Sequence, residues 1–464
     1  MKKKVLSVFF ACILLLCGFL MVGCRDPFTD GEDGEDNVEN KVTITVGILN
    51  EPGEQETMRK FKREFEKIND QINIRITYFP GSYEQAMATY IRKPEDMPDI
   101  VWTGSDKHAA FSSSGHFVDL TEYFARSEET NLDNYYASMI ETTHYNAEDT
   151  GIWFAPRDYN KPVTYLNTTM IEKAGLTVPS VEEWNYETFL QLCRDLREVM
   201  DNEENNTLEQ KQAGLVKNSV PCDGDLTWAP VYLAYTQHLG GSLIDGTQIN
   251  IREENSLLAY EEIHEVIAER LISNPQTDTA DSFLKKSAAM WFTVRPRMQA
   301  VVNTGMEFDF RPLPFDYSGV GCSGYAITTQ ATKRVSQNIA GNTKNNAEYA
   351  WEFIKFIITE PGQEVFGEIG TGVPVLKSLA TDGKWLEYYS ADLNHQAFIG
   401  TEEEDINVNV FSQFPADKQY DATTALNGLF MQIGKEANWT NGKPNATFTQ
   451  ELDSIYTTIS GYLS

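Results

Sequence analysis

The first folded stretch of the chain has a strand–helix–strand pattern that few architectures accommodate. Apolar residues alternate with polar or small ones over Val42–Ile48 and again over Ile72–Tyr78, as they do in half-buried strands. Between these strands, apolar residues recur at helical spacing from Met58 to Ile68. Two strands joined by one helix form a βαβ unit, whose strands are parallel and whose crossover is right-handed. The pattern therefore predicts an α/β fold built on parallel sheet.

The length of the chain requires more than one hydrophobic core. At 464 residues, the chain is too long for one ordinary core, so we expect two domains. A further short buried strand is predicted over Pro98–Trp102. Ligands of parallel sheets bind beyond the carboxyl ends of the strands, so Trp102 and the two residues after it should face a cleft.

The first 41 residues precede the folded part. Residues 1–23 combine a basic start, Lys2–Lys4, with an apolar run, which is typical of a secretion signal. Residues 21–24 are similar to a lipobox, in which Cys24 becomes the lipidated first residue of the mature protein. A plain secretory signal and a membrane anchor helix are the alternatives. Residues 24–41 are acidic and nearly free of apolar side chains, which predicts a flexible tether.

The stretch Gly151–Gly175 is predicted to cross between two lobes. Pro156 resets the backbone, and Val163–Asn167 then starts a new strand. Thr168–Ala174 follows as a short helix that ends at Gly175. A strand, a polar turn and a second strand form an element that can lie at the mouth of a cleft.

Several segments resemble one protein family and occur in its order. The crossing stretch is similar to the G-x-P…Y-N…K-A-G-L segment of extracellular solute-binding protein family 1, the maltose-binding-like substrate-binding lipoproteins of sugar ABC transporters. The matching residues are Gly151, Pro156, Tyr165, Asn167, Lys173, Ala174, Gly175 and Leu176. Further similar segments are Phe117–Thr121, Gly240–Ile244, Phe283–Trp291, in which Ser287 replaces the usual Gly, and Glu360–Gln363. The resemblance covers residues 42–379. After residue 379 the chain has the general character of the family but no matching segment.

The resemblance implies a two-lobed periplasmic-binding-protein-like fold of type II, in which each lobe is a mostly parallel sheet flanked by helices. It implies a hinge crossed three times, with later crossings near Gly319–Thr328 and at Gly372–Val375. Residues 42–163 and 325–372 would form the first lobe. Residues 164–324 and 373–464 would form the second.

The side chains in this sequence best suited to binding a ligand are aromatic residues with polar neighbours. A sugar has apolar faces and a rim of hydroxyls, so its site needs flat rings together with carboxylates, amides or Arg. The resemblance places Trp102, Trp153, Trp228 and Trp291 in cleft-facing loops, although each fits a core position equally well.

Charged residues and two tyrosines complete the candidate site. Asp158, next to Arg157 on the crossing, can accept hydrogen bonds from two ligand hydroxyls; a solvated charge and an ion pair in the hinge are the alternatives. Arg295 follows Trp291 by four residues and would lie near it. The candidate ligand contacts are Trp102, Asp158, Arg157, Trp228, Trp291, Arg295, Tyr83, Tyr325 and Trp153.

Composition and motifs argue against several other kinds of site. A formal net charge of −30 disfavours nucleic acid as a partner. Gly319–Gly324 fits G-x-G-x-x-G, but a strand-like stretch follows it, so we interpret it as a tight hinge turn rather than a dinucleotide site. The six histidines are scattered, and we expect neither a metal nor a cofactor.

The three cysteines beyond the leader, Cys193, Cys222 and Cys322, do not form a disulfide framework. They fit small buried apolar positions, while a bridge between Cys222 and Cys322 stays open.

These features predict a monomeric lipoprotein at the extracellular face of the cell membrane that captures a mono- or oligosaccharide between two lobes. The resemblance implies delivery to an ABC permease that a separate ATPase serves, with no bond made or broken. The alternatives are a secreted polysaccharide-degrading enzyme, a surface adhesion or scaffolding lipoprotein, and a binding protein for a non-sugar neutral solute.

Overall fold

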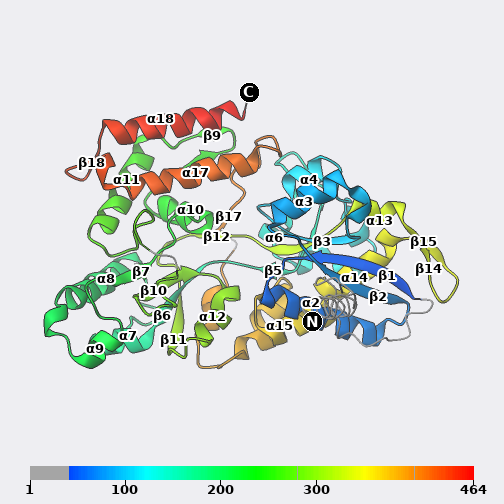
Figure 1. The fold of residues 1–464 in the computed structure, drawn as a ribbon, viewed down its shortest axis with the longest axis horizontal. Helices are drawn as coiled ribbons and strands as arrows, with labels where there is room; N and C mark the ends of the chain where they lie inside the picture. Colours follow the sequence, from blue (N-terminus) through cyan, green and yellow to red (C-terminus); the bar gives the residue numbers. More distant parts are fainter. Residues whose placement is uncertain (1–40, 279–280, 402, 464) are drawn as a thin grey trace, which may run out of the picture.

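The computed structural model describes residues 41–278, 281–401 and 403–463. The predicted signal peptide, the lipidation site Cys24 and nearly all of the tether lie outside these residues. Figure 1 shows two bodies side by side, each built around one sheet with helices on its flanks. We call the body around the five-stranded sheet the first lobe and the body around the four-stranded sheet the second lobe. The two-lobed α/β architecture is confirmed, while the residue boundaries of the lobes stay a prediction.

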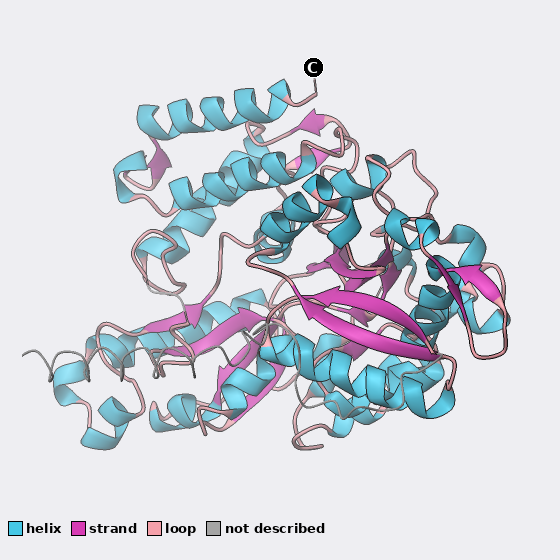
Figure 2. Cartoon of the chain, turned by 45° about the vertical axis from the view of Figure 1, so that its right-hand side comes forward, coloured by secondary structure: helices cyan, strands magenta, loops and turns pink. Residues whose placement is uncertain are grey.

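The sheet of the first lobe has the strand order β2-β1-β3-β13-β4 and is seen from its face in Figure 2. The predicted βαβ unit is present as β1, α2 and β2, with Val42 paired to Ile72 at one end of the register. Alternate β1 side chains are buried, as the sequence pattern predicts. The strands are β1 (Val42–Ile48), β2 (Ile72–Tyr78), β3 (Ile100–Gly104), β4 (Ala155–Pro156) and β13 (Ser323–Ile327).

Helices cover this sheet, and most follow the strands directly along the chain. A capping box at Ser82 starts α3, and Pro in the first turn marks the starts of α2 and α15. The helices are α2 (Pro52–Ile68), α3 (Tyr83–Arg92), α4 (Ala109–Ser113), α5 (Thr121–Phe124), α6 (Ala137–Glu141), α13 (Thr329–Lys333), α14 (Asn346–Ile358), α15 (Glu360–Ile369) and α16 (Lys377–Asp382). An exposed hairpin, β14 (Val335–Gln337) with β15 (Thr343–Asn345), separates α13 from α14.

The sheet of the second lobe has the order β11-β6-β10-β7. Its strands are β6 (Val163–Asn167), β7 (Val220–Asp223), β10 (Ala288–Thr293) and β11 (Phe308–Pro312). Its helices are α7 (Thr168–Lys173), α8 (Tyr186–Asp201), α9 (Leu208–Gln212), α10 (Ala229–His238), α11 (Glu254–Ala268), α12 (Met298–Val302), α17 (Gln419–Ile433) and α18 (Ala446–Gly461). The short hairpins β8 (Ile244–Asp245) with β9 (Gln248–Ile249) and β18 (Trp439–Thr440) with β19 (Lys443–Pro444) lie between helices.

Both sheets are less uniformly parallel than the resemblance implied. β1 runs parallel to β2 and β3, but β13 is antiparallel to both β3 and β4. In the second lobe β10 is parallel to β7, while β6 is antiparallel to β10 and β11. The reason is the connectivity: β6 and β13 each enter a sheet directly from the hinge, without the helical crossover that keeps neighbouring strands parallel.

The hinge is built from short strands that pair with one another. β5 (Asp158–Tyr159) pairs with β16 (Val373–Pro374), and β12 (Ser318–Val320) pairs with β17 (Asp405–Asn407). Residues 372–375 therefore lie against the first crossing. The chain after them still packs on α15. It reaches β11 of the second lobe from Tyr389 onward: the Tyr389 ring stacks on Phe308 at 5.5 Å between centroids, and the turn His395–Phe398 packs on β11 further along.

The glycine-rich stretch between β11 and β13 is extended, so the prediction of a tight turn there was wrong. Its glycines allow close approach of other backbone. A Cβ on Gly319 would lie 2.3 Å from the Cα of Pro230, and one on Gly324 would lie 2.0 Å from the carbonyl oxygen of Ala155. Both distances are below any normal contact, so these positions need glycine for packing rather than for turning.

Candidate functional site

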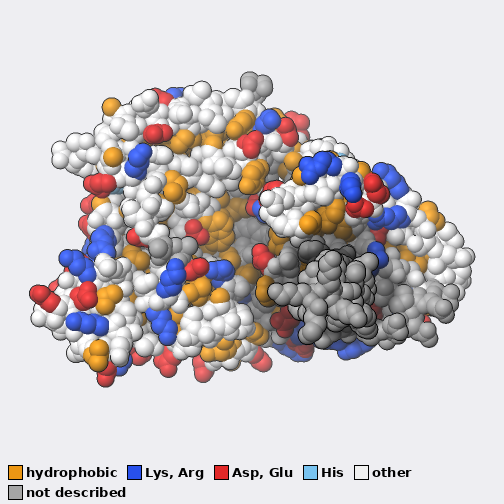
Figure 3. All heavy atoms as spheres, viewed as in Figure 1, with side chains coloured by type: hydrophobic (Ala, Val, Ile, Leu, Met, Phe, Trp, Pro, Cys, Tyr) orange, Lys and Arg blue, Asp and Glu red, His pale blue; other side chains and the backbone are white. Residues whose placement is uncertain are grey.

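A cavity of about 360 Å³ lies between the two lobes. Figure 3 shows the hollow between the halves of the molecule, with hydrophobic side chains gathered inside it. The first lobe contributes the end of β3 and the residues up to Ala110, and the second lobe contributes the start of α10 and one side of α17. The hinge forms the base through Asn160, Pro162 and Gly321–Ser323. A guest in this cavity therefore touches both lobes and the segments that join them.

Two tryptophans line the cavity from opposite lobes. Trp102 lies in β3, as the rule for carboxyl ends of parallel strands predicts, and Trp228 directly precedes α10. Both side chains are half-buried, and neither indole makes a hydrogen bond with any described residue. Tyr83 does not line the cavity but packs edge-on against Trp102 at 5.9 Å between ring centroids, and its hydroxyl hydrogen bonds to Thr103 over 2.8 Å. It holds the Trp102 ring in place.

The polar lining is almost entirely uncharged. Asp106 and Lys107 are the charged residues among the described side chains that line the cavity. They lie 3.5 Å apart, and Lys107 also pairs with Glu84 at 3.1 Å. The uncharged polar lining residues are Ser105, Asn160, Ser323, Asn409, Gln419, Tyr420, Thr423, Thr424 and Asn427. Such a lining supplies hydroxyls and amides, which can both donate and accept hydrogen bonds.

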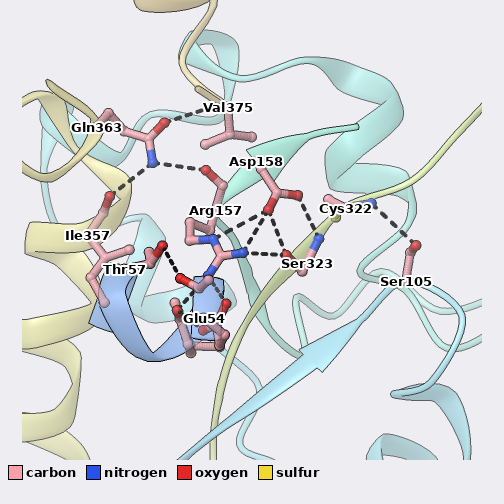
Figure 4. Close-up of polar contacts among 12 residues, drawn as sticks. Glu54, Thr57, Ser105, Arg157, Asp158, Cys322, Ser323, Ile357, Gln363 and Val375 are labelled. Carbon is pink, nitrogen blue, oxygen red and sulfur yellow. Dashed lines mark hydrogen bonds and ion pairs between the residues drawn. The ribbon is translucent and has the colours of Figure 1, made fainter. Parts of the chain in front are cut away.

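Arg157 and Asp158 lie below the cavity in a buried network that Figure 4 shows. Arg157 donates to Glu54 of α2 over 2.7 Å, to the Tyr325 hydroxyl over 2.7 Å and to Asp158 over 3.0 Å. Asp158 also accepts from the backbone N–H and the hydroxyl of Ser323, at 2.8 and 2.6 Å. Arg157, Asp158 and Tyr325 do not line the cavity. Of the alternatives for Asp158, the structure contains the hinge ion pair.

The electrostatics of this network favour a permanently charged Arg157. Burial alone would lower the pKa of Arg157, but Glu54, Tyr325 and Asp158 raise it well above its ordinary value. Burial raises the pKa of the Tyr325 phenol, which therefore stays protonated and donates to Glu54 over 2.7 Å. Gln363 of α15 extends the network: its amide donates to the carbonyl oxygen of Arg157 and accepts from the Val375 N–H.

Arg295 lies outside the cavity, in the short turn that follows strand β10 of the second sheet. It is 1% exposed and donates to the carbonyl oxygens of Gly370 and Trp385 and to Nδ1 of His395. Burial lowers the pKa of Arg295 to about 10, and burial followed by the charge of Arg295 lowers that of His395 to about 4. Gly370 ends α15, so Arg295 ties a loop of the second lobe to a helix of the first.

Trp291 and Trp153 also lie outside the cavity. Trp291 is 6% exposed in β10 and packs between Tyr165 and Phe283, on the opposite face of the strand from Met290. Trp153 donates from its indole N–H to Asp149 over 2.7 Å and packs on Tyr145. Of the nine candidate contacts, the structure brings Trp102 and Trp228 to the cavity, and whether they bind a ligand stays a prediction.

Sequence reasoning missed the side of α17 that lines the cavity. Gln419, Thr423 and Asn427 recur at a spacing of four residues, which places them on one helical face. The recurrence of these polar side chains at helical spacing, beside the buried Ala422 and Leu426, was the available signal. It was not used because the resemblance does not extend to this part of the chain.

The cysteines and histidines of the described chain do not form a further centre. Cys193, Cys222 and Cys322 are all buried and free, so the structure contains no bridge between Cys222 and Cys322. No group of His, Cys, Asp or Glu within residues 41–278, 281–401 and 403–463 is arranged to hold a metal ion. None of the helices in the same ranges has the length and apolar composition that crossing a membrane requires.

The family model of the bacterial extracellular solute-binding proteins matches residues 50–364, which is more than half of the chain. The chain belongs to this family. No curated protein matches this solute-binding protein in sequence.

Solved structures show the same fold. UgpB from Mycobacterium tuberculosis, in complex with glycerophosphocholine, superposes with a TM-score of 0.69 at 15% identity, covering 90% of this chain and 99% of that one. The ABC substrate-binding protein Lmo0181 from Listeria monocytogenes, in complex with cycloalternan, gives 0.67 at 15% identity and the same coverage. MalE from Listeria monocytogenes, in complex with maltose, gives 0.63 at 15% identity, covering 91% and 97%. At these identities the likeness establishes the architecture of the solute-binding protein.

Proposed function

We propose that this protein captures a mono- or oligosaccharide in the cavity between its lobes and delivers it to the permease of an ABC importer. The observation that carries the proposal is the cavity itself: Trp102 and Trp228 reach it from opposite lobes, and uncharged hydroxyl and amide side chains surround them. Indole rings fit the apolar faces of a sugar, and the polar groups fit its hydroxyls. Solved relatives of the same fold hold maltose and cycloalternan.

A ligand that touches both lobes favours the closed arrangement, because only that arrangement makes all of its contacts. Release at the permease then requires the lobes to part. The protein acts as a monomer, and the lipid on Cys24 holds it at the extracellular face of the membrane through the acidic tether. A Cys24→Ala variant should appear in the culture medium rather than in the membrane fraction, and continued retention there would remove the lipid anchor from the proposal.

The residues that line the cavity also help to distinguish sugar binding from the alternative functions. A glycoside hydrolase needs two carboxylates that flank the scissile bond. Asp106 is the only carboxylate among the described side chains that line the cavity, and it is paired with Lys107. We therefore favour binding without turnover over a polysaccharide-degrading enzyme. An adhesion or scaffolding role would not explain the presence of this cavity.

The test is a binding titration with maltose, maltotriose, tagatose, cycloalternan and glycerophosphocholine, which occupy solved relatives. We expect at least one of the sugars to bind the purified mature protein and to raise its melting temperature. Trp228→Ala should then weaken binding by at least about tenfold, the equivalent of roughly 1.4 kcal/mol from one lost ring contact. Tyr389→Ala, an exposed aromatic outside the cavity, is the control and should bind as the parent does.

Three outcomes would contradict the proposal. If glycerophosphocholine is the only panel compound that binds, the ligand is a polar solute other than a sugar. The absence of any binding, with no shift in melting temperature, would favour the adhesion role. Release of shorter sugars during the titration would favour the enzyme.

A further inference from the structure

Gln419 stands at the first position of α17 and has two sides that face different lobes. Its side chain is 6% exposed and belongs to the lining of the cavity. Its amide nitrogen donates to the carbonyl oxygen of Tyr145 over 2.8 Å and to that of Phe414 over 3.2 Å. Tyr145 belongs to the first lobe, whereas α17 packs in the core of the second. One side chain thus connects the two lobes beside the cavity.

The loop that receives this hydrogen bond, Tyr145–Gly151, is ordered by hydrogen bonds to one of its own residues, Asp149. Asp149 accepts from the Tyr145 N–H, from the Gly151 N–H and from the indole of Trp153, at 3.0, 3.1 and 2.7 Å. A second contact joins the loop to the other lobe, because the Ala147 N–H donates to the carbonyl oxygen of Ser412 over 3.1 Å. Trp153, predicted as a ligand contact, instead braces the loop that Gln419 binds.

The two carbonyl partners also fix which way the Gln419 amide is turned. A carbonyl can only accept, so both contacts require the NH₂ group, and Oε1 must point elsewhere. Oε1 accepts no hydrogen bond from any described residue, and it is not sealed away from solvent. A side chain that lines the cavity and keeps an open acceptor is suited to a hydroxyl donor.

From these contacts we infer that Gln419 couples ligand to lobe closure: its Oε1 accepts from a hydroxyl of the bound sugar while its NH₂ clips α17 to the first lobe. The ligand hydrogen bond orders the amide and so strengthens the clip, which in turn holds the cavity wall formed by α17 in place. The sugar contact rests on the proposed function, whereas the clip does not.

Two variants separate the halves of this inference. Gln419→Met removes both the donor and the acceptor at similar length. Gln419→Glu keeps oxygens on the cavity side but loses the NH₂ group, so it breaks the clip alone. Gln450→Met is the matched control: it makes the same Gln-to-Met substitution at an exposed position of α18, a helix that does not line the cavity. Melting curves identify any variant that fails to fold. If one Gln419 variant fails to fold, the other is used for the measurements below.

The first measurement is hydrogen–deuterium exchange of peptides that contain residues 144–151, without any sugar. Both Gln419 variants should speed exchange there by roughly 2- to 10-fold, the range expected for one lost hydrogen bond, and Gln450→Met should not. Exchange in this loop that matches the parent in both variants would overturn the clip and with it the inference.

The second measurement adds the panel sugar that binds the parent best. The sugar should slow exchange of residues 144–151 in the parent and leave it unchanged in Gln419→Met, whose affinity should fall by about 2- to 10-fold. Equal protection by sugar in the parent and in Gln419→Met would overturn the coupling. If no panel sugar binds the parent, the proposed function fails, and the first measurement alone decides whether Gln419 clips the lobes.

Discussion

Replacing Arg157 tests the view that the hinge is held by a buried charge network. Among the described residues, Arg157 supplies the guanidinium that faces Glu54 and Asp158, whose side chains are 8% and 4% exposed, and Arg157→Met removes it. Glu54 would keep the Tyr325 hydroxyl as a donor, and Asp158 would keep both groups of Ser323. Within the part of the chain that the structure describes, neither carboxylate would keep a positive partner. Removing one member of a buried ion pair costs about 3–5 kcal/mol because an uncompensated charge remains in a poorly solvated place.

The expected loss of stability is therefore about 3–5 kcal/mol, read as a lower urea midpoint in an unfolding titration followed by tryptophan fluorescence. Arg126→Met is the matched control. Arg126 pairs with Glu348 at 2.8 Å, but its side chain is 44% exposed, so its loss should cost less than about 1 kcal/mol.

A second substitution shows whether the cost comes from the stranded charges. Adding Glu54→Gln to Arg157→Met removes one uncompensated carboxylate, so the double variant should be more stable than Arg157→Met alone. The reasoning would be refuted if Arg157→Met cost no more than the Arg126 control, or if Glu54→Gln added to the loss instead of offsetting it.

Two further predictions concern acid stability and the hinge strands. His108 is fully buried, and burial lowers its pKa to about 3, whereas the unfolded chain takes up the proton near pH 6.5. Its stabilising contribution is thus complete above about pH 6.5 and is lost as the pH falls toward 3, at up to about 1.4 kcal/mol per unit. His108→Gln should flatten the pH dependence of the urea midpoint between pH 6.5 and 4.5, and an unchanged slope would count against it. Gly324→Ala should lower stability by about 1–3 kcal/mol because its Cβ would meet the Ala155 carbonyl, whereas Gly428→Ala in α17 meets nothing within 4 Å and should be neutral or stabilising. Equal midpoints for the two glycine variants would disprove the packing argument.

The sequence determined the first lobe well because its signals are local. The alternation in Val42–Ile48 and Ile72–Tyr78 and the helical spacing between them each follow from which face of an element is buried. The predicted crossing also matches: β6 covers Val163–Asn167 and α7 begins at Thr168. The rule for carboxyl ends of parallel strands placed Trp102 at the cavity without any structural information.

The remaining site residues were harder to predict because nothing local distinguishes a cavity wall from a packed face. Trp291 and Trp228 are both indoles in family-like segments, yet the pleat turns Trp291 toward Tyr165 and Phe283. Arg295 follows Trp291 by four residues, but the chain turns after β10 and sends the guanidinium to the end of α15. In both cases, contacts between residues far apart in the sequence determine where the side chain lies.

Between the lobes, the charged side chains of the hinge and the neutral side chains of the cavity have different roles. The charged side chains Glu54, Arg157 and Asp158 are sealed beneath the cavity, where partners in fixed directions satisfy them. The cavity above them presents amides, hydroxyls and indoles, together with Asp106 and Lys107, which pair with each other. A neutral guest needs no counter-charge, so charges facing it would only add a desolvation cost on binding. The same charges at the hinge keep strong, directional contacts, since Ser323 both lines the cavity and hydrogen bonds to Asp158. Ser323 therefore joins the lining of the cavity to the hinge network, whose charged members do not line the cavity.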